Sequence, residues 1–347
     1  MSLNTPFLCF SLVVLTLACG VHSAPRPGLF SVMADRDLCV FEDPTSLVTF
    51  SPSAVVGNLL LHQRVVSVVA SSKPGGSFVV FGSQTVAVHR QAHRPFELAF
   101  NFHPDITIYD ATYVPTTGVL MAVGVNGSTG WPEVVFFRSE DGGFRWTSWP
   151  SQRHTYSTSG SISFSSSGDL GLCVLGDYIF RSVDGGRSWV NSAWNASSGL
   201  VTSVAVLDSS LAVATTANSR GGGMVLISTN AGATWQLNPN AAFAAGSGVV
   251  LVDRQTWVVA TQSGQIWRTP DGGKTWARTF AHSNTDWTGL AYNSDWGALL
   301  AVGYFFNDTG GAGAMALSWD MGGQWLLSSP LDKAHMFDRV VPGTPSL

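Results

Sequence analysis

Thr269–Trp276 reads T-P-D-G-G-K-T-W, and four other stretches repeat its pattern: Ser139–Trp146 (S-E-D-G-G-F-R-W), Ser182–Trp189 (S-V-D-G-G-R-S-W), Ser228–Trp235 (S-T-N-A-G-A-T-W) and Ser318–Trp325 (S-W-D-M-G-G-Q-W). A hydroxyl residue comes first, Asp or Asn third, Gly fifth and Trp eighth. An Asp or Asn side chain accepts hydrogen bonds from backbone N–H groups of a turn, and Gly supplies the positive φ that closes it. The Trp ring then packs against a neighbouring sheet. We interpret all five stretches as structural hairpin turns, with these residues in a structural role: Asp141, Trp146, Asp184, Trp189, Asn230, Trp235, Asp271, Trp276, Asp320 and Trp325.

The five turns recur at a regular period. Their first residues, 139, 182, 228, 269 and 318, are 43, 46, 41 and 49 positions apart. A period of this length is typical of a repeat architecture. The eight-residue unit resembles the Asp-box, also called the BNR repeat, which lies on the hairpin between the last two strands of a β-propeller blade. This resemblance implies a propeller and leaves the function open.

Two degenerate boxes extend the series upstream, at Phe41–Pro44 and at the turn from His89 to Pro95. Seven units of about 46 residues each have the size of four short antiparallel strands. The sequence therefore predicts an all-β chain that forms a single seven-bladed β-propeller. The N-terminus offers three strands and the C-terminus one, near Met336–Val341. We expect these terminal strands to pair in one blade and close the ring, which would cover two free sheet edges.

The N-terminal segment is predicted to be separate from the propeller. Phe7–Ala18 is an apolar run that is short for a bilayer span, and small residues follow it up to Ala24. This pattern is typical of a secretory signal peptide. We expect residues 1–24 to be the signal peptide, 25–343 the propeller and 344–347 a tail. The remaining chain contains no apolar stretch of membrane-spanning length.

Composition narrows the class of partner. The formal net charge is -4, only 12% of the residues are charged, and no basic run occurs. Nucleic acid is therefore not an expected partner. Three N-x-[ST] sequons, at Asn126, Asn195 and Asn307, agree with a secretory route. Beyond the leader only Cys39 and Cys173 remain, in strands expected on opposite sides of the ring, so we predict two unpaired buried thiols. We expect a monomer without a cofactor.

The loops at the end of the blades opposite the boxes are the expected place for a ligand. The longer ones are predicted at Ser51–Gln63, Val125–Glu133, Pro150–Ser159, Ala217–Gly223 and Tyr304–Gly313. Three histidines, His103, His154 and His282, each precede a core residue of the next strand by eight positions. They are candidates for ligand binding. Imidazole is a common metal ligand, but these three loops are too far apart to share one ion, so no metal site is predicted.

Aromatic residues are the second set of ligand-binding candidates. Trp131, Phe305 and Phe306 lie beside Gly in predicted loops, and Tyr156, Trp194 and Trp287 are expected near the same face. Such rings stack on sugars or anchor a partner peptide, although Trp is also common filler between blades.

Known box-bearing propellers supply the functional alternatives. Sialidases have six blades, an arginine triad and an early R-I-P motif. This chain contains no R-I-P motif and has seven units. The single seven-bladed form resembles the photosystem II stability/assembly factor family. This resemblance implies a non-catalytic protein that binds partner polypeptides. We therefore expect a secreted protein, not an enzyme, that binds a protein or glycan. The alternative is a divergent, sialidase-like glycoside hydrolase, whose two carboxylates would come from Asp105, Asp286, Asp308 and Asp338. A plastid lumen, reached through a two-part leader, is the alternative location.

Overall fold

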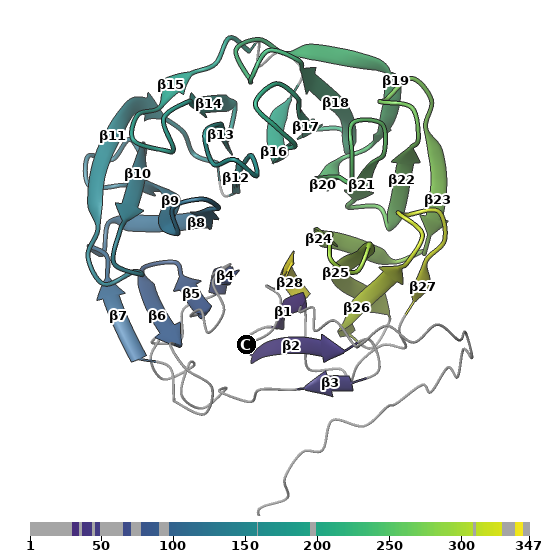
Figure 1. The fold of residues 1–347 in the computed structure, drawn as a ribbon, viewed down its shortest axis with the longest axis horizontal. Coiled ribbons are helices and arrows are strands. Elements are labelled where there is room, and N and C mark those ends of the chain that lie inside the picture. Colours follow the sequence, from purple (N-terminus) through teal and green to yellow (C-terminus); the bar gives the residue numbers. More distant parts are fainter. Residues whose placement is uncertain are drawn as a thin grey trace, which may run out of the picture.

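The computed structural model describes residues 30–34, 37–43, 46–48, 65–70, 78–89, 97–157, 159–194, 199–307, 310–327 and 337–342. Within them the regular structure is all β, and six four-stranded antiparallel sheets follow one another along the chain. Figure 1 shows these sheets around a common axis, with β4, β8, β12, β16, β20 and β24 nearest to it. Each sheet thus runs outward from the axis, as in a propeller blade.

The strands of the six sheets have the following bounds. The first sheet has β4 (Val65–Ala70), β5 (Phe78–Gly82), β6 (Thr85–His89) and β7 (Glu97–Asn101); the second has β8 (Ile106–Val114), β9 (Val119–Asn126), β10 (Glu133–Ser139) and β11 (Thr147–His154). The third has β12 (Gly160–Phe164), β13 (Gly171–Leu175), β14 (Tyr178–Ser182) and β15 (Val190–Asn191); the fourth has β16 (Leu200–Val206), β17 (Ala212–Ala217), β18 (Gly222–Ser228) and β19 (Gln236–Ala244). The fifth has β20 (Gly246–Leu251), β21 (Trp257–Thr261), β22 (Gln265–Thr269) and β23 (Ala277–Ala281); the sixth has β24 (Thr285–Asn293), β25 (Ala298–Asn307), β26 (Gly310–Ser318) and β27 (Leu326–Leu327).

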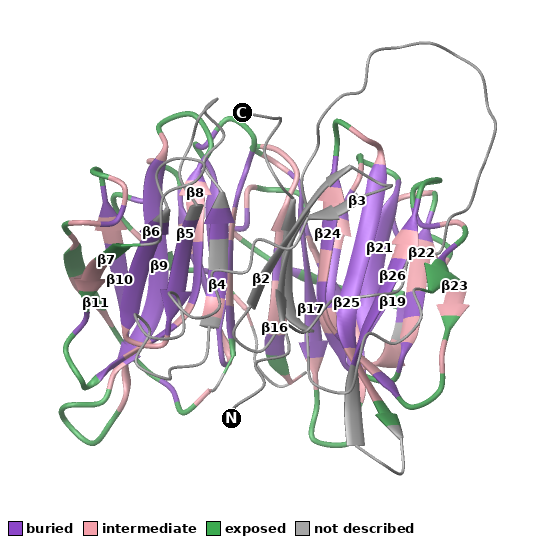
Figure 2. Ribbon diagram, turned by 90° about the horizontal axis from the view of Figure 1, so that it is seen from below, coloured by how far each residue is buried: buried purple, intermediate pink, exposed green. Residues whose placement is uncertain are grey.

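Burial changes from strand to strand across each sheet. In the fifth sheet every residue of the second strand, β21, is buried, whereas the outer strand β23 is mostly exposed. Figure 2 shows the same gradient in the first and second sheets, from the buried strands β5 and β9 to the more exposed outer strands β7 and β11. The second strands carry nearly continuous apolar sequence, such as Gly171–Leu175 (GLCVL), because neighbouring sheets cover both of their faces.

The core lies between neighbouring sheets. One cluster joins Val79 and Phe81 of the first sheet to Leu120 and Phe137 of the second, and four similar clusters follow around the axis. The second to fifth sheets therefore contribute to the core on both of their faces. Cys173 lies in this core and is a free thiol, whereas the structure describes the backbone of Cys39 but not its side chain.

Five of the six innermost strands contain a register shift near their first residue: β4, β8, β16, β20 and β24. An extra residue at a bulge leaves a partner-strand carbonyl without its ladder hydrogen bond. In three sheets the hydroxyl of the extra residue donates to such a carbonyl: Thr202 to Thr215, Ser247 to Ala260 and Thr288 to Val302, at 3.1–3.2 Å. These bonds satisfy the carbonyls beside the axis.

The two ends of the chain pair with each other. β1 (Phe30–Ala34) lies between β28 (Phe337–Pro342) and β2 (Asp37–Asp43), and β3 (Ser46–Val48) pairs with the other edge of β2. All three pairs are antiparallel, and Val32 is opposite both Cys39 and Val340. β28 also contacts β24 of the sixth sheet and β4 of the first. No helix among the described residues is long and apolar enough to cross a membrane.

Two of the predicted loops are wrong. Pro150–His154 belongs to strand β11, and all but two residues of the predicted Tyr304–Gly313 loop belong to β25 and β26. In both places the strand ladder extends further than the local sequence indicates: β11 pairs with β10 as far as His154, and β25 pairs with β26 as far as Asn307 and Gly310. Of the two degenerate boxes, residues 44 and 90–95 are outside the described part of the chain.

Candidate functional site

The ends of the sheets form two different rims. The box rim consists of the five Asp-box turns between third and fourth strands. The loop rim is the opposite end, with the loops between second and third strands and the connections between sheets. The repeated geometry of the box rim shows which residues serve the fold.

The first and fifth residues of every box make the same contact. The hydroxyl of Ser139, Ser182, Ser228, Thr269 or Ser318 accepts the N–H of the fifth-position glycine at 2.8–2.9 Å. That glycine has φ between 75° and 101° in all five boxes. A Cβ atom there would come within 2.4–3.3 Å of a side chain. Glycine is therefore required both by its backbone conformation and by the close approach of neighbouring side chains.

The third residue organises the rest of the turn. Oδ1 of Asp184 accepts the hydroxyl of Ser182 and the N–H groups of Arg187 and Ser188, and Oδ2 accepts the hydroxyl of Ser188. Asp271 makes the corresponding bonds to Thr269 and Thr275. The hydroxyl and N–H of Thr275 lower the pKa of Asp271 to about 2. These carboxylates are ionised acceptors within their own turns, which agrees with a structural role.

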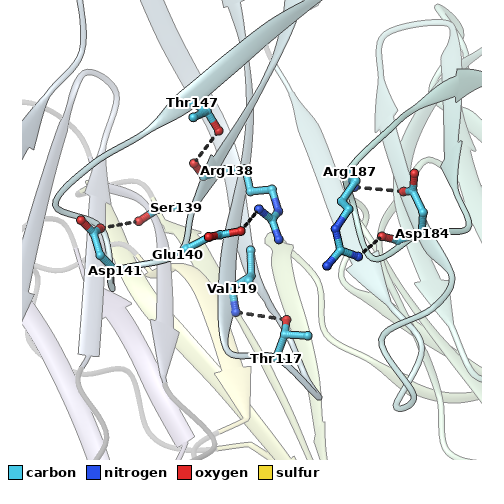
Figure 3. A network of polar contacts seen from close by, with 9 residues as sticks. All are labelled: Thr117, Val119, Arg138, Ser139, Glu140, Asp141, Thr147, Asp184 and Arg187. Carbon is cyan, nitrogen blue, oxygen red and sulfur yellow. Dashed lines mark hydrogen bonds and ion pairs between the residues drawn. The ribbon is translucent and has the colours of Figure 1, made fainter.

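The eighth residue links neighbouring sheets. Trp235 and Trp325 are part of the clusters that join their own sheet to the preceding one, and Trp146, Trp189 and Trp276 pack against three others. The Trp189 ring stacks on Phe136 of the preceding sheet, with 4.8 Å between ring centroids. Figure 3 shows two neighbouring boxes, with Asp141 facing Ser139 and Asp184 facing Arg187.

Two boxes have a residue other than glycine at the fourth position. Ala231 and Met321 have φ of 60° and 58°, a left-handed conformation that strains a side chain. In both, an arginine of the preceding sheet donates its Nε–H to the carbonyl of that residue: Arg181 to Ala231 at 2.6 Å and Arg268 to Met321 at 2.9 Å. These bonds tie the strained turn to its neighbour.

At the loop rim the three candidate histidines have different surroundings. His103 lies 3.3 Å from the carboxylate of Asp105, His154 bonds the carbonyl of Trp131 at 3.2 Å, and His282 bonds the hydroxyl of Thr285 at 2.7 Å. His154 is the last residue of β11, not a loop residue as predicted. His103 and His154 flank the second sheet, and His282 precedes the sixth, across the ring (Figure 1). Within the described residues no three His, Cys, Asp or Glu side chains form a group that suits a metal ion.

The aromatic candidates separate into exposed and buried residues. Trp131 and Tyr156 are 64% and 69% exposed, and their ring centroids are 6.2 Å apart. The edge of the His154 ring contacts Trp131. Trp287, expected near the rim, is wholly buried between the fifth and sixth sheets. Its position in β24 points it into the core, because alternate residues of a strand face opposite sides.

Phe305 and Phe306 lie in strand β25, although the sequence predicts a loop. They point to opposite faces of the sixth sheet. Phe305 contacts the ring of His282 and packs against the core, whereas Phe306 is 45% exposed and contacts Tyr304. Trp194 is partly buried against the core between the third and fourth sheets. Of the six aromatic candidates, only Trp131, Tyr156 and Phe306 are exposed.

Of the four acids nominated for hydrolysis, only Asp105 and Asp286 have described side chains, and these two belong to different sheets. Asp105 is at the entry to the second sheet, and Asp286 is in strand β24 of the sixth sheet, not in a rim loop as predicted. Asp286 is partly buried, and burial raises its pKa, against a hydrogen bond from Tyr304 at 3.3 Å. Asp338 lies in strand β28 with its side chain undescribed, and Asp308 is outside the described residues.

Of the three sequons, Asn126 ends strand β9 and its Oδ1 accepts the N–H of Ser128 at 3.0 Å. Asn307 ends β25, with its side chain undescribed, and Asn195 lies outside the described part of the chain.

Comparison with known proteins identifies the fold. No family model and no curated protein matches the sequence. Among solved structures, the chain is similar to YCF48 from Cyanidioschyzon merolae, with 14% identity, TM-score 0.53 and coverage of 80% of this chain and 94% of that chain. It is also similar to a structure of a nidogen/laminin complex, with 7% identity, TM-score 0.54 and coverage of 92% and 100%. A structure of YCF48 bound to D1 peptide matches with TM-score 0.47 and 19% identity, over 68% of this chain and 74% of that chain. The expected likeness to the propeller of the photosystem II assembly factor is confirmed at the level of fold.

Proposed function

We propose that this chain is a non-enzymatic seven-bladed propeller that binds a partner molecule through its loop rim. One observation carries the proposal: Trp131, His154 and Tyr156 form an exposed aromatic cluster at the loop end of the second sheet. Large exposed rings are unfavourable in water and are enriched where proteins bind ligands or partners. The cluster has no counterpart in the repeated geometry of the boxes, so the fold does not require it.

The rigidity of the cluster supports a binding role. The Tyr156 hydroxyl donates to the carbonyl of Gly130 at 3.3 Å, and the Thr155 N–H donates to that of Pro132 at 2.9 Å. Together with the His154–Trp131 bond, these contacts join the segment after β11 to the loop between β9 and β10. The rings are therefore held in place before a partner arrives, which lowers the entropy lost on binding.

The seventh blade and ring closure belong to this proposal. The set β28-β1-β2-β3 would be the seventh blade, and its support is the pairing of β1 with β28 and the contacts of β28 with β24 and β4. Removal of residues 336–347 is expected to lower the melting temperature by many degrees, because it exposes the edge of β1 and removes the contacts of β28 with β24 and β4. An unchanged melting temperature would exclude this closure.

The proposed compartment is the secretory pathway or the exterior, with the plastid lumen as the alternative. The sequence of residues 1–24 and the three sequons support it. Expression in a eukaryotic secretory host is expected to release a protein whose N-terminus lies near residue 25 and whose mass falls on treatment with an N-glycosidase. Retention of the full leader, or an intracellular product, would contradict the secretory assignment.

The binding face is testable by site-specific photocrosslinking. A photoreactive amino acid at Thr129 lies in the loop that carries Trp131, and the same residue at Lys274 lies in an Asp-box at the opposite rim. We expect crosslinked products from the native source with the Thr129 variant and none with the Lys274 variant. Equal labelling at both positions, or labelling at Lys274 alone, would contradict binding at the loop rim.

Glycoside hydrolysis is the second candidate, because Asp286 is a partly buried carboxyl with a raised pKa and a tyrosine hydroxyl beside it. A raised pKa suits a general acid. Turnover of a fluorogenic glycoside that is abolished by Asp286→Asn would establish this activity and overturn the non-enzymatic proposal. Absence of turnover across a glycoside panel supports binding alone.

A further inference from the structure

We propose that the Trp131–His154–Tyr156 cluster is a platform for an uncharged sugar ring, so that the ligand of the loop rim is a glycan. This inference rests on the proposed function and specifies its ligand class. A pyranose has a flat apolar face of C–H groups and a periphery of hydroxyls. It fits a site that offers an aromatic ring with hydrogen-bonding groups around it.

The aromatic part of the site is large and accessible. Trp131 and Tyr156 expose 64% and 69% of their surface, and the two rings are tilted by 51° to each other. The described contacts of Trp131 with other rings are those with His154 and Tyr156. Two tilted rings at this separation present an angled surface wide enough for one or two sugar units, and aromatic rings supply most of the apolar contact area in such sites.

The polar part of the site consists of small side chains. Ser128 and Thr129, in the loop of Trp131, and Gln152, two residues before His154, are exposed. His154 adds a directed acceptor. Its Nδ1 must donate to the carbonyl of Trp131, since a carbonyl only accepts, and the neutral ring then has Nε2 as its acceptor. A sugar hydroxyl is a suitable donor to that nitrogen.

The charges next to the cluster are already engaged, which favours a neutral ligand. The guanidinium of Arg153 lies over the ring of Tyr178, 5.9 Å from its centroid. The carboxylate of Glu133 accepts the N–H of Gln152 at 2.9 Å. Both charges already have a partner within the chain, and residues 126–130 of the loop carry no aliphatic side chain that would favour a hydrophobic peptide.

The test measures binding of the full mature chain to immobilised chitohexaose, cellohexaose and a complex-type N-glycan by biolayer interferometry. We expect binding to at least one probe, and a loss of about tenfold or more in affinity for Trp131→Ala and for Tyr156→Ala, as for hot-spot aromatic residues. Trp131→Tyr is expected to retain part of the affinity. The matched control is Trp319→Ala, which removes a 44%-exposed tryptophan from the box rim. It is expected to bind like the unmodified protein.

The outcomes separate this inference from the proposed function. Absence of binding to all three probes, or equal binding by Trp131→Ala and the unmodified chain, would overturn the glycan platform. An equal loss for Trp319→Ala would also overturn it. If photocrosslinking at Thr129 then yields a protein partner, the loop rim remains the binding face and only the glycan assignment fails. All variants alter exposed side chains, so only small changes of the melting temperature are expected, from the lost hydrogen bond of Tyr156 and the lost stacking of Trp319 on Trp296.

Discussion

At the box rim five turns place the same atoms in the same contacts, whereas at the loop rim the contacts that recur are those at the bulges of the innermost strands. Every box has a hydroxyl bonded to a glycine N–H and a tryptophan between two sheets. At the other end His103, His154 and His282 have three different partners. Repetition marks the residues that hold the sheets together. The proposed binding surface lies at the rim whose loops differ from sheet to sheet.

The largest expected difference between the rims is in the stability lost when a glycine is replaced by alanine. Gly232, at the fifth box position, has φ of 75°, and a Cβ there would lie 2.4 Å from a methyl group of Leu172 in the preceding sheet. Gly130, in the loop of Trp131, has φ of 76° and nothing within 4 Å of its Cβ position. Gly232→Ala is expected to destabilise the fold by about 3 kcal/mol, from left-handed strain and overpacking, and Gly130→Ala by about 1 kcal/mol, from strain alone.

Chemical denaturation of the two alanine variants measures both free energies of unfolding. Equal losses would show that packing between sheets at the box contributes nothing beyond backbone strain, and the contrast between the rims would then disappear.

The next largest difference is in the stability lost when an aspartate is replaced by alanine. Asp184 accepts four hydrogen bonds within its box, whereas Asp105 at the loop rim has His103 as its described side-chain partner. Asp184→Ala is expected to cost about 1–2 kcal/mol, because two backbone N–H groups and two hydroxyls lose their acceptor. Asp105→Ala is expected to change the melting temperature within experimental error, since an exposed pair contributes little. A comparable loss for both variants would contradict the structural role assigned to the box.

Within the box rim itself, the two strained boxes give a smaller effect. Ala231 has φ of 60°, while Gly142, Gly185 and Gly272 occupy the same position in other boxes. Ala231→Gly is expected to stabilise the fold by about 0.5 kcal/mol, the relief of left-handed strain less the greater freedom of glycine in the unfolded chain. Ala233→Gly, two residues later and without a positive φ, is expected to destabilise. Melting temperatures that move in the same direction for both variants would show that strain at Ala231 is not relieved.

The same contrast explains which features were predictable from the sequence. A box is made by contacts four residues apart, so its pattern survives in the local sequence and predicts the turn, the sheet interface and the propeller. The loop rim depends on distant segments. Tyr156 reaches Gly130 only because β11 pairs with β10 up to His154, a ladder longer than the sequence indicates. The sequence places Phe305, Phe306 and Asp286 in loops because strands β24 and β25 extend further than the local pattern indicates, and the burial of Trp287 is set by strand alternation in β24.

The smallest expected effect is an opposite pH dependence at the two rims. Hydrogen bonds lower the pKa of Asp271 in the box to about 2, and burial raises the pKa of Asp286 at the loop rim. A lowered folded pKa contributes stability that is present above the usual aspartate value and is lost as the pH falls toward 2. A raised folded pKa contributes stability below that value that is lost as the pH rises through the folded pKa.

Asp271→Asn should therefore reduce the loss of stability between about pH 4 and pH 2. Asp286→Asn should raise the melting temperature slightly at pH 7 and leave it unchanged at pH 3. Calorimetric scans of both variants across this pH range check the two signs. If Asp271→Asn and Asp286→Asn shift the melting temperature at pH 7 in the same direction, burial does not dominate the pKa of Asp286.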